Sequence, residues 1–475
     1  MPSSRASLVT ALGAALLGAA APAGAQSSDR LAAVDRYIEA ERVRQHIPGV
    51  SAAVLRGGRV LLARGYGFAS LEHRVRATDS TVYQSGSVGK QFTAALIQLL
   101  AAEGRLGLDD PIRRYVPGPR SWDRITIRHL LTHTSGIPDY ADSTLDYRRD
   151  YTEDDLVRLA ATLPVEFPPG EHWHYSNTGY LLLGAIVRKV TGHFYGEELH
   201  RRIFGPLGMR ITRIISERDI VPNRSDGYVL DDDGGPAHQD WVAPSINTTA
   251  DGSLYFTIGD LVRWARALDG GPIPGRELLA AAWTPVRLKG GGSYPYGFGW
   301  ELGQQRGHPR VGHGGSWQGF RTAIQRYPEY GITVIVLANL AEAEPEAIAY
   351  AVAGMLEPAL AAPHVSPAAG GGAAPPRPIP ELLRALADSV PGAGNAALEE
   401  FLLPDTRRSM GALLEPGATW TAQGCDEVAA KSVERLGRRV ARVCYARATG
   451  GTAGHLVEVS YTDDGEPAFV DWYDF

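Results

Sequence analysis

The sequence has only two cysteines, Cys425 and Cys444, among its 475 residues. Two cysteines provide no framework of several disulfides. In an exported chain the two could form one disulfide, which would stabilise the fold by about 3 kcal/mol for a loop of this size. The alternative, two unpaired buried thiols, stays open at this stage.

Lysine is also scarce. It occurs only at positions 90, 189, 289 and 431, and arginine supplies the rest of the 47 basic residues. The net charge is −6 and the pI is near 6.1, so the composition gives no reason to expect a nucleic-acid partner or an anionic membrane surface. The chain contains no glycine-rich phosphate loop of the Walker type, and we expect no cofactor.

Apolar runs are short. The run from Leu8 to Ala20 follows Arg5 and precedes the small residues Ala23-Gly24-Ala25, so residues 1–25 are predicted to be a secretory signal peptide. No other stretch approaches the ~20 apolar residues that a membrane-spanning helix needs. We expect an exported protein, periplasmic or secreted, that begins near Gln26 and has no stable membrane insertion. An uncleaved anchor is the alternative.

The length allows more than one compact unit, at about 150 residues per domain. Hydrophobic residues make up 44% and charged residues 21% of the chain, as in an ordinary globular protein. Residues 361–380 are rich in proline, glycine and alanine and carry almost no charge, which is typical of a linker. This segment separates a domain at 26–360 from a small α+β domain at 381–475, in which we find no catalytic constellation.

The hydrophobic pattern predicts helices and strands in an order typical of an α+β fold. Predicted helices cover 31–45, 179–190, 261–268, 345–356, 381–389 and 395–403, and predicted strands cover 50–55, 60–63, 321–327, 332–337, 440–446, 455–461 and 468–472. The connections at 56–59 and 328–331 predict β-hairpins. Thr126 is a candidate helix cap, and Thr257 with Asp260 resembles a capping box. We expect an antiparallel sheet with helices packed on it.

Ser87-Val88-Gly89-Lys90 is the only Ser-x-x-Lys sequence in the chain, and it begins an amphipathic helix that stops near Gly104. Residues three apart lie on one helical face, so the Ser87 hydroxyl and the Lys90 amine can come within hydrogen-bond distance. The normal lysine pKa is ~10.4, and a lysine base therefore needs surroundings that lower its pKa. The alternative is an N-capping serine ahead of a surface lysine.

Two histidine pairs raise the question of a metal site. His129 and His133 are spaced for one helical face, but no glutamate stands between them in an H-E-x-x-H pattern. His172 and His174 form a His-x-His pair without an evident third ligand. We interpret these histidines as structural and predict no metal. A histidine-based metallohydrolase is the alternative.

Two further motifs follow Ser87 in the chain: Tyr175-Ser176-Asn177, between a Pro-Pro-Gly turn and a helix, and His313-Gly314-Gly315, before apolar strands. With Ser87-Val88-Gly89-Lys90 they resemble the serine β-lactamase and penicillin-binding-protein-like superfamily, in the branch of class C β-lactamases, D-Ala-D-Ala carboxypeptidases, D-aminopeptidases and esterases. The segment 129–137 also looks like a family signature. The resemblance covers about residues 30–356. It implies a β-lactamase/transpeptidase-like fold, with an antiparallel sheet flanked by helices and a mainly helical lobe.

The resemblance also implies a mechanism. Ser87 would attack a carbonyl and form an acyl-enzyme, which water then releases. Lys90 and Tyr175 would take the serine proton and deliver it to the leaving group, and which of the two is the base stays open. Asn177 would orient Lys90 and donate to a substrate amide.

The third motif would form the other wall of the site. The main-chain N–H groups of Ser87 and Ser316 would form the oxyanion hole, with His313 and Gly315 beside the substrate. Because His313 stands where β-lactamases usually have a lysine, the resemblance favours a small-molecule ester, peptide or amide substrate over a β-lactam. β-Lactam hydrolysis, and a non-catalytic binding protein that retains the pocket, are the alternatives. The oligomeric state is not predicted.

Other segments could supply the same motifs. Ser245-Ile246-Asn247 could serve as the middle motif and Lys289-Gly290-Gly291 as the third. We prefer Tyr175 and His313 for their turn–helix and strand contexts. The Gly-x-Ser-x-Gly pattern of α/β-hydrolases is not met around Ser87, because Ser85 occupies the position of its first glycine.

Overall fold

The computed structural model describes residues 23–140, 145–361, 374–388, 414, 417–427, 434–435, 438–449 and 455–474. Residues 1–22 of the predicted signal peptide, most of the predicted linker and the predicted helix at 395–403 lie outside the described residues. Within the described chain, no helix has the length and apolar character required to cross a membrane.

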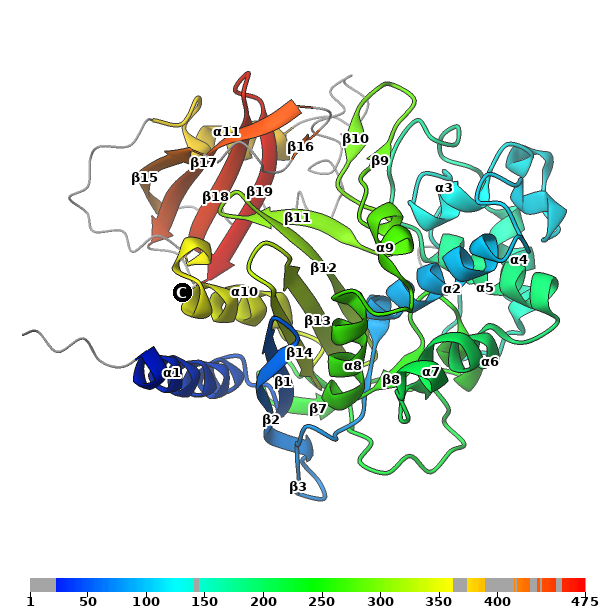
Figure 1. Cartoon of the computed structure of the whole chain (residues 1–475), viewed down its shortest axis with the longest axis horizontal. Helices are drawn as coiled ribbons and strands as arrows, with labels where there is room; N and C mark the ends of the chain where they lie inside the picture. Colours follow the sequence, from blue (N-terminus) through cyan, green and yellow to red (C-terminus); the bar gives the residue numbers. More distant parts are fainter. Residues whose placement is uncertain are drawn as a thin grey trace, which may run out of the picture.

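A seven-stranded antiparallel sheet forms the centre of the larger domain (Figure 1). Its strand order is β11-β12-β13-β14-β1-β2-β3. The strands are β1 (Gly49–Arg56), β2 (Arg59–Ser70), β3 (Val75–Arg76), β11 (Glu301–Gln305), β12 (His308–Trp317), β13 (Phe320–Tyr327) and β14 (Ile332–Ala338). Both predicted hairpins are confirmed. β1 pairs with β14, so the two ends of the domain close one sheet.

Strand β14 is buried on both faces. Successive side chains of a strand point to opposite sides, and those of β14 enter two different cores. Val334 and Val336 of β14 pack in one core with Val34 and Ile38 of helix α1 (Ala23–Arg44) and with helix α10 (Pro345–Leu356). Ile335 and Leu337 of β14 pack in the other core, with α2 (Lys90–Ala102) and α8 (Ile258–Leu268). The sheet is therefore a middle layer between helices.

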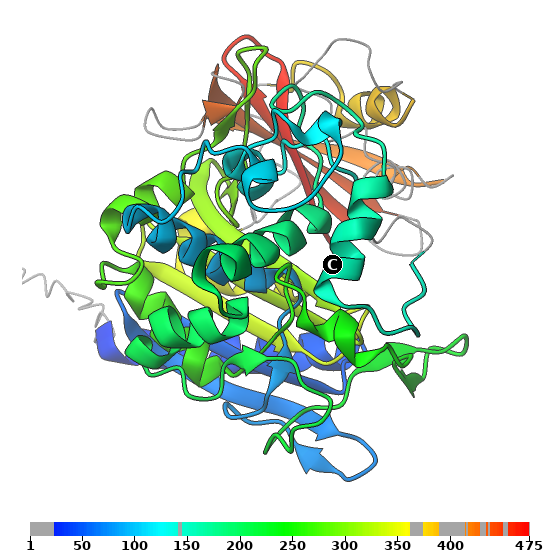
Figure 2. The same ribbon diagram turned by 90° about the vertical axis from the view of Figure 1, so that its right-hand side faces the viewer.

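A mainly helical lobe lies beside α2 (Figure 2). It contains α3 (Ile127–Leu131), α4 (Glu153–Thr162), α5 (Asn177–Thr191), α6 (Tyr195–Leu199), α7 (Gly205–Leu207) and α9 (Arg276–Ala282). Thr126 and Thr257 cap α3 and α8 as predicted. The capping-box prediction for Asp260 was wrong. Its carboxylate instead accepts hydrogen bonds from the main-chain N of Ile211 and Thr212, which lie nearby only in the folded chain.

Short strands fix the loops around Ser87. β8 (Leu254–Phe256) lies between β4 (Tyr83–Gln84) and β5 (Arg213–Ile214). This pairing holds the segment before β8 against the segment after β4. Two further small ribbons are β6 (Tyr228–Leu230) with β7 (Pro236–His238) and β9 (Val286–Arg287) with β10 (Ser293–Tyr294).

The C-terminal segment forms a second sheet, in the order β15-β17-β18-β19 with β16 on β17. Its elements are α11 (Ile379–Ala387), β15 (Thr419–Glu427), β16 (Glu434–Arg435), β17 (Arg438–Thr449), β18 (His455–Thr462) and β19 (Pro467–Asp474). Cys425 and Cys444 are cross-strand partners joined by a disulfide, which decides between the two alternatives. This sheet contacts β11, where buried Gln304 donates hydrogen bonds to Glu458 and Ser460.

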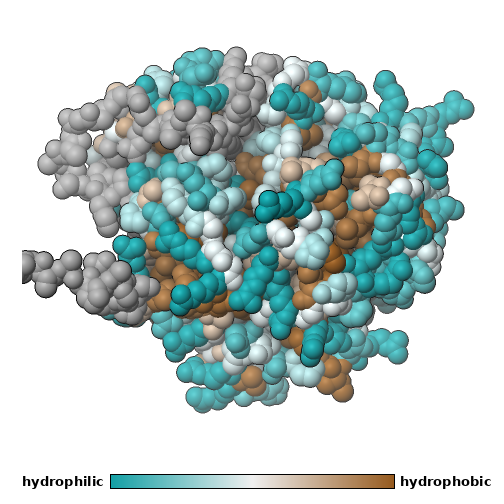
Figure 3. Space-filling view, in the orientation of Figure 1, coloured by the Kyte–Doolittle hydropathy of each residue, from teal (hydrophilic) through white to brown (hydrophobic). Residues whose placement is uncertain are grey.

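The surface shown in Figure 3 mixes hydrophilic and hydrophobic residues. The large hydrophobic side chains that are exposed among the described residues, Val43, Val75, Ile220 and Trp241, come from separate segments. Single exposed hydrophobic residues are normal in folded proteins, so they define no docking surface.

Candidate active site

Ser87 lies on a short 3-10 helix, η1 (Gly86–Gly89), that leads directly into α2. Gly86 has a φ of +51°, and a Cβ at this position would collide with the main-chain N of Ser316. Only glycine adopts this conformation and this close approach without strain. The turn therefore places the start of the Ser87 helix directly against strand β12.

Lys90 is fully buried and donates from Nζ to three oxygens. These are Ser87 Oγ at 3.0 Å, Asn177 Oδ1 at 2.6 Å and the main-chain O of Asp251 at 2.6 Å. Burial lowers the Lys90 pKa to about 8, while the carboxylates of Asp251 and Asp139 oppose that change. Both the charged and the neutral amine are therefore accessible near neutral pH, and the predicted Ser87–Lys90 contact is present.

Asn177 is the first residue of α5, which Ser176 caps by accepting from Gly179 N. Its main-chain N and its Nδ2 both donate to Asp139 Oδ2, each at 2.8 Å. These two bonds fix the orientation of the amide, so that Oδ1 faces Lys90. The contact with Lys90 that we predicted for Asn177 is thus present.

Tyr175 lies two residues before α5, and its ring packs on Lys90 and His133. The Lys90 Nζ is 4.8 Å from the ring centroid, and the His133 ring centroid is at 4.2 Å. The hydroxyl is buried and has no hydrogen-bond partner of suitable geometry among the described residues, although Ser87 is close enough to favour its ionisation. Burial nevertheless raises the Tyr175 pKa well above 10. Tyr175 is therefore a neutral phenol in this structure.

His133 supplies no cation to Tyr175. It is buried, and burial and the nearby Lys90 amine lower its pKa well below 6.5. Its Nδ1 accepts from Ser176 N at 3.1 Å, which ties the segment before α5 to the loop after α3. His133 thus has a structural role, as the sequence indicated.

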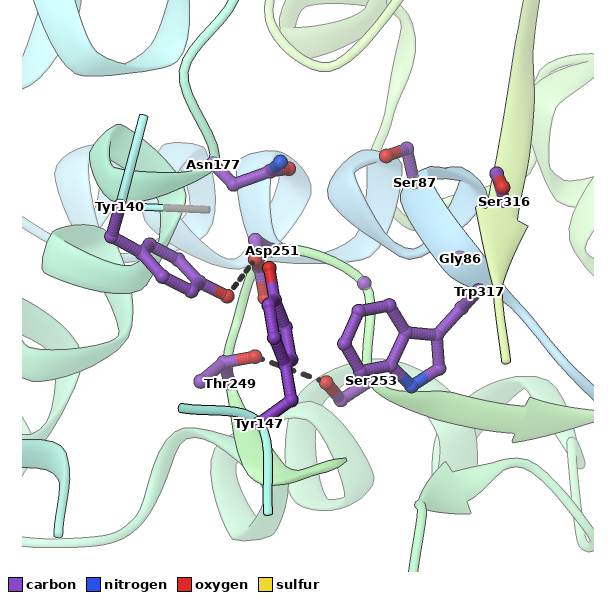
Figure 4. A pocket seen from close by; sticks show the side chains of 11 residues that line it. Gly86, Ser87, Tyr140, Tyr147, Asn177, Thr249, Asp251, Ser253, Ser316 and Trp317 are labelled. Atoms are coloured by element: carbon purple, nitrogen blue, oxygen red, sulfur yellow. Dashed lines mark hydrogen bonds between the residues drawn. The ribbon is translucent and has the colours of Figure 1, made fainter. Parts of the chain in front are cut away.

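The third motif lies on β12, beside η1. β11 pairs with β12 only as far as Gly312, whereas β13 continues along the opposite edge to Trp317. The edge that β11 leaves unpaired faces η1. A Cβ at Gly315 would collide with Ser85 O and lie 3.1 Å from Ser87 N. Ser87 and Ser316 consequently line the same pocket, in which Figure 4 shows their side chains.

His313 is only 2% exposed, and both ring nitrogens have partners. Nε2 lies 2.9 Å from Tyr296 Oη and Nδ1 lies 2.6 Å from Gly314 O, so Nδ1 carries the proton and Nε2 accepts. Burial lowers the His313 pKa, although the Glu301 carboxylate at 3.8 Å opposes this. A neutral His313 supplies no fixed positive charge. It does not line the pocket beside Ser87, and its contact with substrate stays a prediction.

The pocket beside Ser87 contains residues that the sequence did not single out. Its lining consists of Gly86, Ser87, Tyr140, Tyr147, Asn177, Thr249, Asp251, Gly252, Ser253, Ser316 and Trp317 (Figure 4). Asp251 comes from the loop before β8, and Tyr140 from the segment after α3. Their contact joins residues 111 positions apart. Only a comparison of related sequences could have marked these positions, because neither belongs to a local motif.

The alternative motifs lie elsewhere. Asn247 Oδ1 accepts from Trp317 Nε1 at 2.6 Å, so Asn177 and not Asn247 contacts Lys90. Lys289 follows β9, and its main-chain N donates to Gly170 O; it lies outside the pocket lining.

Two further histidines that the sequence singled out, His129 and His174, also have partners in the protein. His129 Nδ1 accepts from Thr126 N at 3.1 Å, and His174 Nδ1 lies 2.5 Å from Glu166 Oε2. Over the part of the chain that the structure describes, no three His, Cys, Asp or Glu side chains are grouped as a metal site.

Comparison with known proteins places this geometry in a family. The sequence model of the family described as Beta-lactamase matches residues 34–356. Penicillin-binding protein 4* of Bacillus subtilis (strain 168) is 34% identical over 303 residues, which cover 60% of this chain and 67% of that protein. D-aminopeptidase of Gluconobacter oxydans (strain 621H) is 27% identical over 427 residues, 82% of this chain and 78% of that protein. Protein flp of Staphylococcus aureus (strain MW2) is 28% identical over 66% of this chain and 64% of its own length. The chain thus spans about two thirds of the length of two of these relatives.

Solved structures agree in fold. The octameric penicillin-binding protein homologue from Pyrococcus abyssi superposes with a TM-score of 0.62 at 25% identity, over 94% of this chain and 96% of that chain. A D-stereospecific amidohydrolase from Streptomyces sp. gives a TM-score of 0.58 at 29% identity, over 67% of this chain and 97% of that chain. The β-lactamase/transpeptidase-like fold is confirmed, and the chain belongs to the Beta-lactamase family of serine hydrolases, within the serine β-lactamase and penicillin-binding-protein-like superfamily.

Proposed function

We propose that this protein is an exported hydrolase that cleaves amide or peptide bonds, and activated esters, through an acyl-enzyme on Ser87. The observation that supports it best is the buried Lys90 amine, which contacts Ser87 Oγ at 3.0 Å and has a pKa lowered to about 8. The similarity to a D-aminopeptidase and a D-stereospecific amidohydrolase favours amides of D-amino acids among the possible substrates.

Acylation begins with proton transfer from Ser87 to the neutral Lys90 amine while Ser87 Oγ bonds to the substrate carbonyl carbon. The negative charge on the carbonyl oxygen is stabilised by the main-chain N–H groups of Ser87 and Ser316. One such donor contributes about 3–4 kcal/mol to transition-state stabilisation. Lys90 serves as the base because the surroundings raise the pKa of Tyr175 and lower that of Lys90.

Tyr175 delivers the proton to the leaving group. Its neutral hydroxyl donates to the leaving nitrogen as the carbon–nitrogen bond breaks, and the Lys90 ammonium replaces that proton. In deacylation a water molecule gives one proton to Lys90 as its oxygen bonds to the acyl carbon. The Lys90 ammonium then gives that proton to Ser87 Oγ as the ester bond breaks, which returns both groups to their starting state.

β-Lactam hydrolysis is the less favoured activity. A neutral, buried His313 offers no fixed cation for the carboxylate of a β-lactam. Export rests on the N-terminal sequence alone, and N-terminal sequencing of mature protein recovered from the periplasm or medium tests it.

The test of the proposed function is a kinetic panel on purified protein: p-nitrophenyl acetate, D- and L-amino-acid amides, a D-Ala-D-Ala peptide and a chromogenic cephalosporin. We expect turnover of the esters and amides, a burst of p-nitrophenol, and labelling of Ser87 by a fluorophosphonate. Ser87→Ala should abolish all three. Absence of both turnover and labelling in the wild-type protein would overturn the proposal.

A further inference from the structure

Among the described residues that line the pocket beside Ser87, Asp251 is the only carboxylate, and there is no lysine, arginine or histidine. Its position is fixed from the main chain. The Asp251 carbonyl oxygen accepts from Lys90 Nζ at 2.6 Å, and a Cβ at the next residue, Gly252, would lie 3.1 Å from Ser87 N. These contacts hold the main chain of the Asp251 segment next to Ser87 and Lys90, and the Asp251 side chain lines the same pocket as Ser87.

The Asp251 side chain is also oriented. Tyr140 Oη donates to Asp251 Oδ2 at 2.8 Å (Figure 4), while Oδ1 accepts no hydrogen bond from the described residues. Burial and the Asp251 charge raise the pKa of Tyr140 well above 10, so this hydroxyl remains a donor. One carboxylate oxygen is thus held by the protein, and the other is available to a ligand.

The charges around the pocket favour a cation over an anion. Asp139, the second carboxylate near Lys90, already accepts two hydrogen bonds from Asn177. His313 is neutral, and the Lys90 ammonium directs its donors to three protein oxygens. A substrate group that enters the pocket between Ser87 and Asp251 therefore meets a carboxylate oxygen that accepts no hydrogen bond from the described residues, in surroundings where two carboxylates, Asp139 and Asp251, lie near one ammonium.

We propose that Asp251 Oδ1 binds the free ammonium group of the substrate, and that the enzyme consequently prefers acyl groups with an unblocked α-amine, such as amino-acid amides and the N-terminal residue of peptides. This assignment rests on the proposed function, since it names the substrate class of the same site. Because Ser87 and Asp251 line the same pocket, an ammonium on the carbon next to the scissile carbonyl would enter the space beside Asp251 when that carbonyl reaches Ser87.

Two aromatic side chains that also line the pocket could contact the rest of the acyl group. Tyr147 and Trp317 lie with their ring centroids 6.1 Å apart and face the pocket (Figure 4). Trp317 is held by its bond to Asn247. An apolar side chain on the same carbon can pack against these rings while its ammonium binds Asp251.

The experiment uses three alanine p-nitroanilides, in both enantiomers, that differ only at nitrogen: the free amine, the N-acetyl derivative and the N-succinyl derivative. These present a cation, a neutral group and an anion. In the wild-type enzyme kcat/KM should fall in that order. In Asp251→Asn the ratio of kcat/KM for the free amine over the N-acetyl substrate should fall about tenfold to a hundredfold, as expected for loss of a charged hydrogen bond. The ratio is internal to each enzyme, so it does not require that Asp251→Asn keep full activity.

Asp109→Asn is the matched control, because Asp109 is an exposed carboxylate paired with Arg128. It should keep the wild-type ratio. A second readout needs no variant: in the wild-type enzyme the same ratio should fall as pH rises through the amine pKa of the substrate, near ~8 for an α-amino group.

The outcomes separate the two proposals. An unchanged ratio in Asp251→Asn, or a wild-type preference for the N-acetyl or N-succinyl substrate, would overturn the role of Asp251 while hydrolysis that requires Ser87 still supports the proposed function. The proposed function would instead be overturned if the enzyme hydrolysed neither these substrates nor p-nitrophenyl acetate in a reaction that depends on Ser87.

Discussion

Asn177 donates two hydrogen bonds to one oxygen of Asp139, from its main-chain N and from Nδ2, each at 2.8 Å. This pairing decides which end of the Asn177 amide faces Lys90. Asp139 also favours the charged form of Lys90 by its own negative charge. One carboxylate thus influences both the orientation of the amide and the ionisation of the base.

Asp139→Asn should therefore change both properties. We expect kcat/KM for an amide substrate to fall about tenfold, because the Asn177 amide loses its charged acceptor. The rising limb of the pH profile should move to lower pH, because removing a negative charge lowers the Lys90 pKa further. Kinetics across pH 5–10 measure both effects. A limb that moves to higher pH would contradict this account, and Asp154→Asn, which alters an exposed carboxylate on α4, serves as the control.

Lys90 should control the rising limb itself. Its neutral form is the base, so kcat/KM should rise with pH through about 8 and level off above it. Lys90→Arg keeps a positive charge but cannot lose its proton, and we expect a loss of at least ~10²-fold. Lys189→Ala is the control. Lys189 lies in the last turn of α5, at the end away from Asn177, and its replacement should leave the pH profile unchanged. A wild-type profile that is flat from pH 6 to 9 would argue against Lys90 as the base.

Tyr175→Phe should distinguish proton delivery from packing. Amide leaving groups need a proton and p-nitrophenolate does not, so amide turnover should fall ~10²-fold or more while ester turnover falls far less. Because the Tyr175 hydroxyl is buried without a hydrogen-bond partner among the described residues, the variant should also be more stable, by about 1 kcal/mol in urea unfolding. Equal losses on both substrates would mean that Tyr175 does not donate to the leaving group.

Gly86→Ala should disrupt the contact between η1 and β12. A methyl group there would collide with Ser316 N, on a backbone with positive φ, so we expect a loss of about 2–4 kcal/mol in unfolding free energy and little labelling of Ser87 by a fluorophosphonate. Gly104→Ala is the matched control. Gly104 also has positive φ but no atom within 4 Å of the added methyl, and its cost should be about 1 kcal/mol. Similar losses in the two variants would show that close packing at Gly86 is unimportant.

Gln304→Leu should weaken the contact between the C-terminal sheet and β11. The substitution leaves the buried Glu458 without its hydrogen bond from Gln304 and should cost about 2–4 kcal/mol. The double variant Gln304→Leu/Glu458→Leu should regain part of that loss, since it also removes the buried carboxylate that has lost its hydrogen bond from Gln304. Chemical unfolding of the wild-type protein, Gln304→Leu, Glu458→Leu and the double variant measures this, and strictly additive losses would contradict a direct coupling.

Features that depend on neighbours in the chain could be predicted from the sequence. The Ser87–Lys90 contact follows from two residues on one helical turn, and the caps at Thr126 and Thr257 follow from the residues just after them. The same local reasoning failed at Asp260, whose carboxylate binds the main chain of Ile211 and Thr212. A local rule cannot detect a better partner that comes from a distant segment.

The sequence by itself thus determined the α+β class, the nucleophile and its lysine, and the motifs at Tyr175 and His313. Only the tertiary structure decided the chemical state of these groups, because a pKa depends on burial and on charges brought together by folding. Folding places Asp139 and Asp251 beside Lys90, and it raises the pKa of Tyr175 while lowering that of Lys90. It also ends the β11 pairing at Gly312, which leaves one edge of β12 free to face Ser87.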